Sequence, residues 1–187
     1  MDRRRALKFA AGLAAAPLAA PARGASLDPT PACPGEGATP RQTEGPYYLP
    51  RSPLKASLRA DAPGAPLVLQ GYVLDTRCRP LPGAWLDLWH ADASGAYDNH
   101  GFRLRGHQFA DAGGRYRFET IVPGLYPGRT RHFHLKLRAA GARRELVTQL
   151  YFPDEPENAR DALFRRELLL RIDLAAGVAR FDFVLAT

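Results

Sequence analysis

Residues 115–126 read R-Y-R-F-E-T-I-V-P-G-L-Y, and this stretch decides the fold. Large apolar residues alternate with polar ones from Arg115 to Val122, which is the period of a β-strand with one buried face. Pro123 and Gly124 then end the strand, so that Tyr126 lies just past it. The stretch therefore predicts a half-buried strand whose end carries a tyrosine.

The same pattern recurs along the chain and predicts an all-β protein. Residues 82–97, P-G-A-W-L-D-L-W-H-A-D-A-S-G-A-Y, form a strand that runs into a Ser-Gly turn and also ends on a tyrosine, Tyr97. The expected strands are Leu67–Asp75, Ala84–His90, Arg115–Val122, Arg131–Ala139, Leu146–Phe152 and Val178–Leu185. Short alternating strands separated by turns predict an antiparallel β-sandwich. The only stretch with helical character is Pro156–Arg166, a short C-terminal segment that we interpret as a surface connection.

Residues 126–135, Y-P-G-R-T-R-H-F-H-L, hold the densest group of chemically active side chains. On a strand, side chains two apart share a face, so His132 and His134 can address one ion while Phe133 packs on the other side. Tyr97 and Tyr126 would complete a set of two phenolates and two neutral imidazoles. Phenolate oxygen is a hard donor, which favours ferric iron over zinc or copper.

Six motifs occur in the order found in intradiol ring-cleavage dioxygenases, the family of catechol 1,2-dioxygenase and protocatechuate 3,4-dioxygenase, and the chain resembles that family. The motifs are T-E-G-P-Y-Y-L at 43–49, L-x-G-x-V-x-D at 69–75, P-x-P-G-A-W-L-D-L-W-H-A-D-A-S-G-A-Y at 80–97, G-R-Y-R-F-E-T-I-V-P-G-L-Y at 114–126, G-R-T-R-H-F-H at 128–134 and L-V-T-Q-L-Y-F at 146–152. The resemblance implies cleavage of a catechol-type ring by O2 between its two hydroxyl-bearing carbons. The product would be a diacid of the cis,cis-muconate type.

The resemblance also implies a role for each site residue. The residues that match the ligands of one Fe(III) per chain are Tyr97, Tyr126, His132 and His134. Arg129 matches the active-site arginine of the family and Gln149 its active-site glutamine, while Tyr126 also takes part in catalysis by accepting a proton from the catechol.

The chain departs from the family pattern beside the first histidine. Family members commonly have Pro-Ala between the arginine and that histidine, whereas this chain has Thr130 and Arg131. Arg131 therefore competes with Arg129 for the catalytic assignment, and the spacing favours Arg129. The connection from Tyr126 to His132 is also shorter than in well-known members. The helical segment through which catechol 1,2-dioxygenases dimerise is missing, so the oligomeric state is left open.

The first residues are typical of an export signal rather than of a fold. Residues 1–25 combine a twin-arginine-like basic head with an apolar run that is too short to span a bilayer. We expect an extended arm at 26–66 and the sandwich domain at 67–187. Cleavage after Ala25 would lower the formal net charge from +7 to about +3, so most of the basic character belongs to the signal. No nucleic-acid partner is expected.

Two cysteines, Cys33 and Cys78, follow this signal. An even cysteine count in an exported chain predicts a disulfide, which would join the arm to the sandwich in a periplasmic or secreted protein.

Several neighbouring residues have weaker assignments. We interpret His90 as a solvated residue or one that supports the metal ligands, and His100 and His107 as members of the polar loop after Tyr97. The arm residues within reach of the pocket are Glu44, Tyr47 and Tyr48, with Tyr47 or Tyr48 as a wall for the substrate. The cations available to a carboxylate on the substrate are Arg103, Arg105 and Arg131.

Three other functions compete with the dioxygenase. A cupin-type oxygenase also uses H-x-H but needs a glutamate a few residues later, and residues 135–142 contain none. A non-catalytic periplasmic β-sandwich that binds a metal or another ligand needs neither tyrosine. A copper chaperone would favour methionine or further histidines near the site, yet Met1 is the only methionine.

Overall fold

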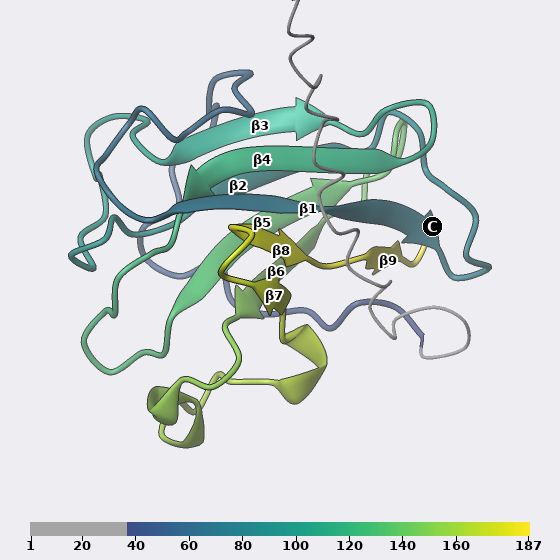
Figure 1. Ribbon diagram of the computed structural model, residues 1–187. Helices are drawn as coiled ribbons and strands as arrows, with labels where there is room; N and C mark the ends of the chain where they lie inside the picture. The colour runs from purple at the N-terminus through teal and green to yellow at the C-terminus, as the bar shows by residue number, and fades with distance from the viewer. Residues whose placement is uncertain (1–36) are drawn as a thin grey trace, which may run out of the picture.

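The computed structural model describes residues 37–187, which fold into a sandwich of two β-sheets (Figure 1). One sheet has the strand order β4-β1-β8-β7, with β9 also paired to β1, and the other has the order β3-β2-β5-β6. The strands are β1 Pro66–Asp75, β2 Trp85–Trp89, β3 Arg105–Phe109, β4 Arg115–Ile121, β5 His132–Arg138, β6 Leu146–Tyr151, β7 Arg171–Asp173, β8 Val178–Arg180 and β9 Phe183–Leu185. The all-β expectation is confirmed, although β1 pairs in parallel with β8 and β9.

The core lies between the two sheets because each strand turns every second residue inward. In β1 the odd-numbered residues from Leu67 to Asp75 are buried and the even-numbered ones are more exposed. From the other sheet, Leu86 of β2 and Phe133 and Leu135 of β5 are fully buried in the same core. The histidines of β5 therefore point to the opposite, outer face of their sheet.

The arm covers that outer face. The backbone N–H of Gln42 donates to Val147 O of β6 at 2.8 Å, and the N–H of Lys55 donates to His107 O of β3 at 3.0 Å. These contacts join the arm to both edges of the sheet β3-β2-β5-β6, so residues on its outer face are buried although they are not part of the core between the sheets.

Some strands differ from the expectation. β3 and β7 were not predicted, and His107 lies in β3 rather than in a loop. The single strand expected at Val178–Leu185 is divided into β8 and β9. Between them, the Asp182 carboxylate accepts a hydrogen bond from the backbone N–H of Tyr72 in β1 at 2.9 Å. This N–H is then not available to pair with the backbone of a continuous strand.

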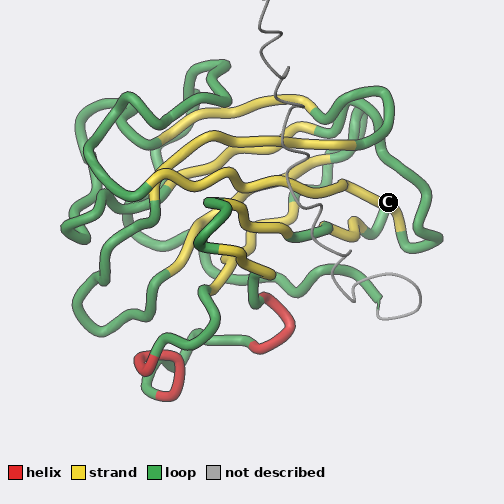
Figure 2. Tube along the Cα trace, viewed as in Figure 1, coloured by secondary structure: helices red, strands yellow, loops and turns green. Residues whose placement is uncertain are grey.

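The expected helical stretch, Pro156–Arg166, contains one 3₁₀ turn instead of a continuous helix, and a second turn begins at its last residue; both turns lie in the segment below the strands in Figure 2. The turns are η1 Pro156–Ala159 and η2 Arg166–Leu168. Asp161 interrupts the helix because its carboxylate accepts the N–H of Leu163 at 2.9 Å, a local bond that competes with helical bonding. Asp161 is buried, so this segment is more than a surface connection.

The export signal at 1–25 and Cys33 lie outside the described residues. Among the described residues no cysteine is a free thiol, but the disulfide between Cys33 and Cys78 stays a prediction. No helix within residues 37–187 is long and apolar enough to cross a membrane.

Candidate active site

Two adjacent loops carry the two predicted tyrosine ligands. The loop after β2 contains Tyr97 and the loop after β4 contains Tyr126, and the N–H of Gly124 donates to Asp92 O at 2.7 Å to join them. A Cβ at Gly95 would lie 1.9 Å from Leu125 O, and one at Gly124 would lie 2.4 Å from the nitrogen of Gly95. Only glycine permits this approach. The Ser-Gly and Pro-Gly turns in the sequence therefore bring the tyrosines together.

His132 and His134 point to the same side of β5 and are 4% and 3% exposed. Their Nε2 atoms are 3.1 Å apart, and the Tyr97 hydroxyl lies 3.4 Å from Nε2 of His132. Nδ1 of His132 donates to Thr130 O at 2.6 Å, which leaves a lone pair on Nε2 of the neutral ring. The Trp89 ring stacks on His134 with centroids 5.0 Å apart, which fixes that ring.

Burial controls the charge of these groups. Burial lowers the pKa of His132 to about 4 and holds the pKa of His134 well below its ordinary value. Both rings are therefore neutral at pH 7, as metal ligation requires. Burial raises the pKa of the Tyr97 phenol, and the positive charges of Arg129 and Arg105 oppose that rise.

Tyr47 of the arm contacts both predicted tyrosine ligands. Its ring stacks on Tyr97 with centroids 4.5 Å apart, and its hydroxyl is 3.0 Å from the hydroxyl of Tyr126. The rings of Tyr97 and Tyr126 are nearly perpendicular, with centroids 6.1 Å apart. Of the two arm tyrosines, Tyr47 is the one at the site, while Tyr48 packs against Trp89 instead.

Arg129 and Gln149 lie together beside the histidines. Gln149 of β6 is opposite His134 in the strand register, and its Oε1 accepts Nη2 of Arg129 at 2.6 Å. Asp161 accepts Nε of Arg129 at 2.9 Å, and the hydroxyl of Tyr151 donates to Gln149 Oε1 at 3.1 Å. The sequence did not predict Asp161 or Tyr151 at the site. No local motif marks an aspartate that binds an arginine 32 positions earlier in the chain.

Arg131 points away from this group. Its Nε donates to the Glu155 carboxylate at 2.6 Å, and it also bonds the Pro123 carbonyl. The alternation of the strand explains the difference, since Arg131 and His132 are adjacent and face opposite sides. Arg103 pairs with Asp92 at 3.6 Å on the surface.

The other residues that the sequence placed near the site do not contact the two tyrosine ligands, the two histidines, Arg129 or Gln149 through any hydrogen bond or ion pair within residues 37–187. His90 is not solvated, because it is buried between the sheets, where its ring nitrogens bond Ala91 O at 2.7 Å and the Thr120 hydroxyl at 2.6 Å. Glu44 pairs with Lys136 on the outer face of the sheet. His107 Nδ1 bonds Ser52 O at 2.8 Å. His100 is an exposed loop residue.

The donor set suits a hard metal ion. In residues 37–187 no group of three or more His, Cys, Asp or Glu side chains is placed to hold a metal, so a metal here needs the tyrosines as ligands. Two neutral Nε2 atoms face each other at 3.1 Å with a phenolic oxygen beside them. The residues therefore fit a ferric ion.

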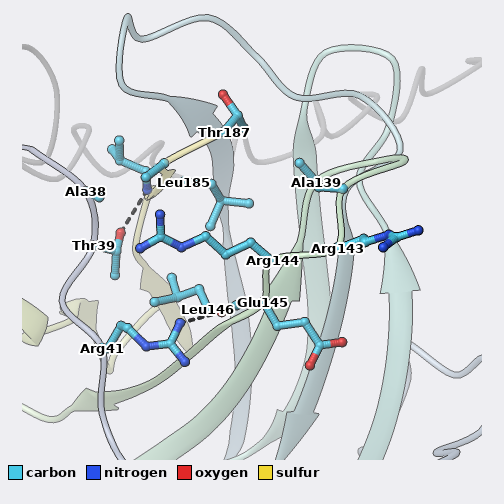
Figure 3. Close-up of a pocket in the computed structure, with 13 residues that line it drawn as sticks. Ala38, Thr39, Arg41, Ala139, Arg143, Arg144, Glu145, Leu146, Leu185 and Thr187 are labelled. Atoms are coloured by element: carbon cyan, nitrogen blue, oxygen red, sulfur yellow. Dashed lines mark hydrogen bonds between the residues drawn. The ribbon is translucent and has the colours of Figure 1, made fainter.

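A cavity of about 470 Å³ opens beside Tyr126 and Arg129 and provides space next to the cluster. Its other lining residues are Leu125, Pro127, Gly128, Glu157, Arg160 and Asp161. A separate cavity of about 280 Å³, in which Arg144 extends toward Thr39, is shown in Figure 3 and contains none of the predicted site residues.

Comparison with known proteins identifies the family. A family model described as Dioxygenase matches residues 43–186. The beta chain of protocatechuate 3,4-dioxygenase from Burkholderia cepacia is 37% identical over 119 residues, which cover 54% of this chain and 51% of that protein. Catechol 1,2-dioxygenase from Acinetobacter baylyi is 30% identical over 151 residues, which cover 65% of this chain and 48% of that protein. The chain thus spans about half the length of these relatives.

One solved structure has a higher sequence identity to this chain than these two relatives, and the match covers almost all of that structure. The dioxygenase domain of a dioxygenase carbohydrate-binding protein fusion from Streptomyces sp. SirexAA-E is 51% identical, with a TM-score of 0.76, and the match covers 86% of this chain and 99% of that one. The family match includes both tyrosine loops, the H-x-H strand and the Arg129–Gln149 pair. The chain belongs to the intradiol dioxygenase family.

Proposed function

We propose that this protein is a non-haem Fe(III) intradiol dioxygenase that cleaves a catechol-type ring with O2 to a diacid of the cis,cis-muconate type. The observation that carries the proposal is the convergence of Tyr97, His132 and His134. The Tyr97 hydroxyl lies 3.4 Å from Nε2 of His132, and that Nε2 lies 3.1 Å from Nε2 of His134. Tyr126 lies beside Tyr97 and supplies the fourth ligand. When bound, ferric iron withdraws electron density from the catechol and makes its ring reactive toward O2.

Each of the surrounding side chains has a role that follows from its position. As a phenolate, Tyr126 would take one of the two protons that the catechol loses, and the Tyr47 hydroxyl, 3.0 Å from the Tyr126 oxygen, would hold the resulting phenol by a hydrogen bond. Arg129 is a permanent cation that stabilises the negative charge developing on the ring. Asp161 and Gln149 hold the guanidinium by bonds of 2.9 and 2.6 Å, so it is oriented before the substrate arrives.

Metal content and colour test the proposal directly. We expect the purified protein to be red to purple with one ferric ion per chain, because phenolate ligands of ferric iron absorb visible light strongly. Oxygen uptake should follow the addition of at least one member of a panel of catechols. Colourless protein that carries zinc or copper, or iron-loaded protein inactive on the whole panel, would contradict the proposal.

A pair of tyrosine variants separates a ligand from a structural residue. Tyr97→Phe should reduce and shift the visible absorption and weaken iron binding, because it removes one of the two proposed phenolate ligands. Tyr72→Phe is the matched control, since Tyr72 belongs to β1 of the other sheet and contacts Arg115 and Arg180. It should keep both iron and colour.

Export is a further part of the proposal and rests on residues 1–25. An exported chain meets an oxidising compartment, in which Cys33 and Cys78 should be linked. Peptide mapping of protein recovered from the periplasm, under non-reducing conditions, should yield the cross-linked peptide. Recovery of both cysteines as alkylated free thiols would contradict the linkage.

A further inference from the structure

Arg105, the first residue of β3, is a buried cation that the proposed chemistry does not use. It is 2% exposed and ranks among the largest buried side chains of the described chain. Its Nε and Nη2 both donate to Asp98 O, at 3.1 and 2.7 Å. Its Nη1 is buried and has no hydrogen-bond partner among the described residues.

The buried guanidinium has no carboxylate of the described residues in direct contact, although the charges of Asp98 and Asp87 act on it from a distance. Taking such a cation out of water costs several kcal/mol unless an anion compensates it, and a backbone carbonyl is only a partial substitute. The carboxylate of Asp98, the residue whose carbonyl Arg105 binds, faces its own loop, where it accepts the N–H groups of Gly101 at 2.9 Å and Arg103 at 3.0 Å. No carboxylate of residues 37–187 forms an ion pair with Arg105.

The group that Arg105 holds is directly connected to Tyr97. Asp98 O belongs to the residue that follows Tyr97, so the two-pronged bond from Arg105 fixes the chain beside the tyrosine. Arg105 and Tyr97 also interact electrostatically. A negatively charged Tyr97 would therefore add to the charges of Asp98 and Asp87 in balancing the buried cation.

We propose that Arg105 is a positioning residue for Tyr97, which anchors the Tyr97–Asp98 segment and supplies the buried positive charge that balances a phenolate at Tyr97 when the metal is bound. This inference rests on the proposed function. It explains why an arginine that is only 2% exposed begins an edge strand without an ion pair to a carboxylate of residues 37–187. It also assigns Arg105 to the ligand rather than to a carboxylate on the substrate.

The test compares three variants of the iron-loaded protein. Arg105→Met removes the charge and keeps an apolar side chain, Arg105→Lys keeps the charge and loses the two-pronged bond, and Arg103→Met removes the neighbouring exposed cation as a control. The measurements are iron affinity by competition with a chelator and the position of the phenolate-to-iron absorption band. The band reports on the phenolate itself, which a purely structural role of Arg105 would leave unchanged.

We expect Arg105→Met to bind iron about tenfold more weakly and to absorb at longer wavelength. Without the nearby positive charge the phenolate electrons lie higher in energy, so their transfer to the iron needs less light energy. Arg105→Lys should keep the wild-type band position with weaker iron binding, and Arg103→Met should match the wild type in both measurements. If Arg105→Met does not fold, the lysine variant decides by its affinity.

Two results would overturn the inference. If the wild type is coloured, either of two outcomes would refute the role of Arg105 and leave the proposed function intact. One is a wild-type band position and affinity in Arg105→Met, and the other is a wild-type affinity in Arg105→Lys. A wild-type protein that binds no ferric iron would instead refute the proposed function, and this inference with it.

Discussion

At the scale of single residues, Arg129 and Arg131 show how two residues of the same type acquire different roles. Arg129 lies in the turn before β5 and reaches Gln149, which is opposite His134. Arg131 is directly before His132 and faces the other way, toward Glu155. The position of each guanidinium relative to the histidines is a consequence of strand alternation rather than of residue type.

These positions predict that removing the Arg129 charge lowers turnover and that removing the Arg131 charge does not. Arg129→Leu should retain iron and colour but lower kcat by roughly a hundred- to a thousandfold, because the lost charge is one that stabilises the transition state. Arg131→Leu should turn over at close to the wild-type rate. Steady-state oxygen uptake with the best catechol of the panel measures both. Normal turnover by Arg129→Leu together with an inactive Arg131→Leu would reverse the two assignments.

At the scale of elements, the arm is held to the sheet by a buried polar group as well as by its backbone. The hydroxyl of Ser52 donates to Asp87 Oδ1 at 2.7 Å, and the hydroxyl of Tyr48 donates to Oδ2 at 3.3 Å. Asp87 is 1% exposed on β2, and although burial raises its pKa, the two hydroxyls oppose the rise. Because the same arm carries Tyr47 into the site, its docking affects function as well as stability.

Two serines of the arm test this docking. Ser52→Ala should lower the free energy of unfolding by about 1–3 kcal/mol, because a buried carboxylate loses its shorter hydrogen bond. Ser57→Ala is the control, since Ser57 is exposed and its bond to Glu119 is 3.3 Å long, and it should change stability by about 0.5 kcal/mol or less. Urea titration measures both variants. Equal destabilisation by the two changes would show that the Asp87 contact does not hold the arm.

At the scale of the whole molecule, the packing of the two sheets makes stability depend on pH through His90. Burial between the sheets lowers the pKa of His90 to about 4. Because the folded protein holds this ring neutral and the unfolded chain does not, its contribution is complete above about pH 6.5 and is lost as the pH falls toward 4. The two sheets should therefore separate more easily in mild acid.

His90→Gln isolates this contribution. Between pH 7 and pH 5 the metal-free wild type should lose about 2 kcal/mol more unfolding free energy than the metal-free variant. His132 and His134 are present in both proteins, so their own contributions cancel in the comparison. Urea titrations at the two pH values provide the measurement, and equal losses in the two proteins would exclude His90 as a source of acid sensitivity.

The sequence by itself determined the parts that depend on local period and turn chemistry. Alternation predicted β1, β2, β4, β5 and β6, because a strand must turn every second residue toward the core. The same period placed His132 and His134 on one face, and the turn glycines placed Tyr97 and Tyr126 in the loops that follow β2 and β4. These features follow from residues within a few positions of one another.

Only the tertiary structure decided the features that depend on contacts across the chain. β3 and β7 are short strands whose polar residues have no clear period, and they form because a neighbouring strand offers hydrogen bonds. Tyr47 reaches Tyr126 across 79 positions, and Asp161 reaches Arg129 across 32. No local pattern specifies such partners, since the free energy that selects them comes from burial and hydrogen bonding after the sheets have packed.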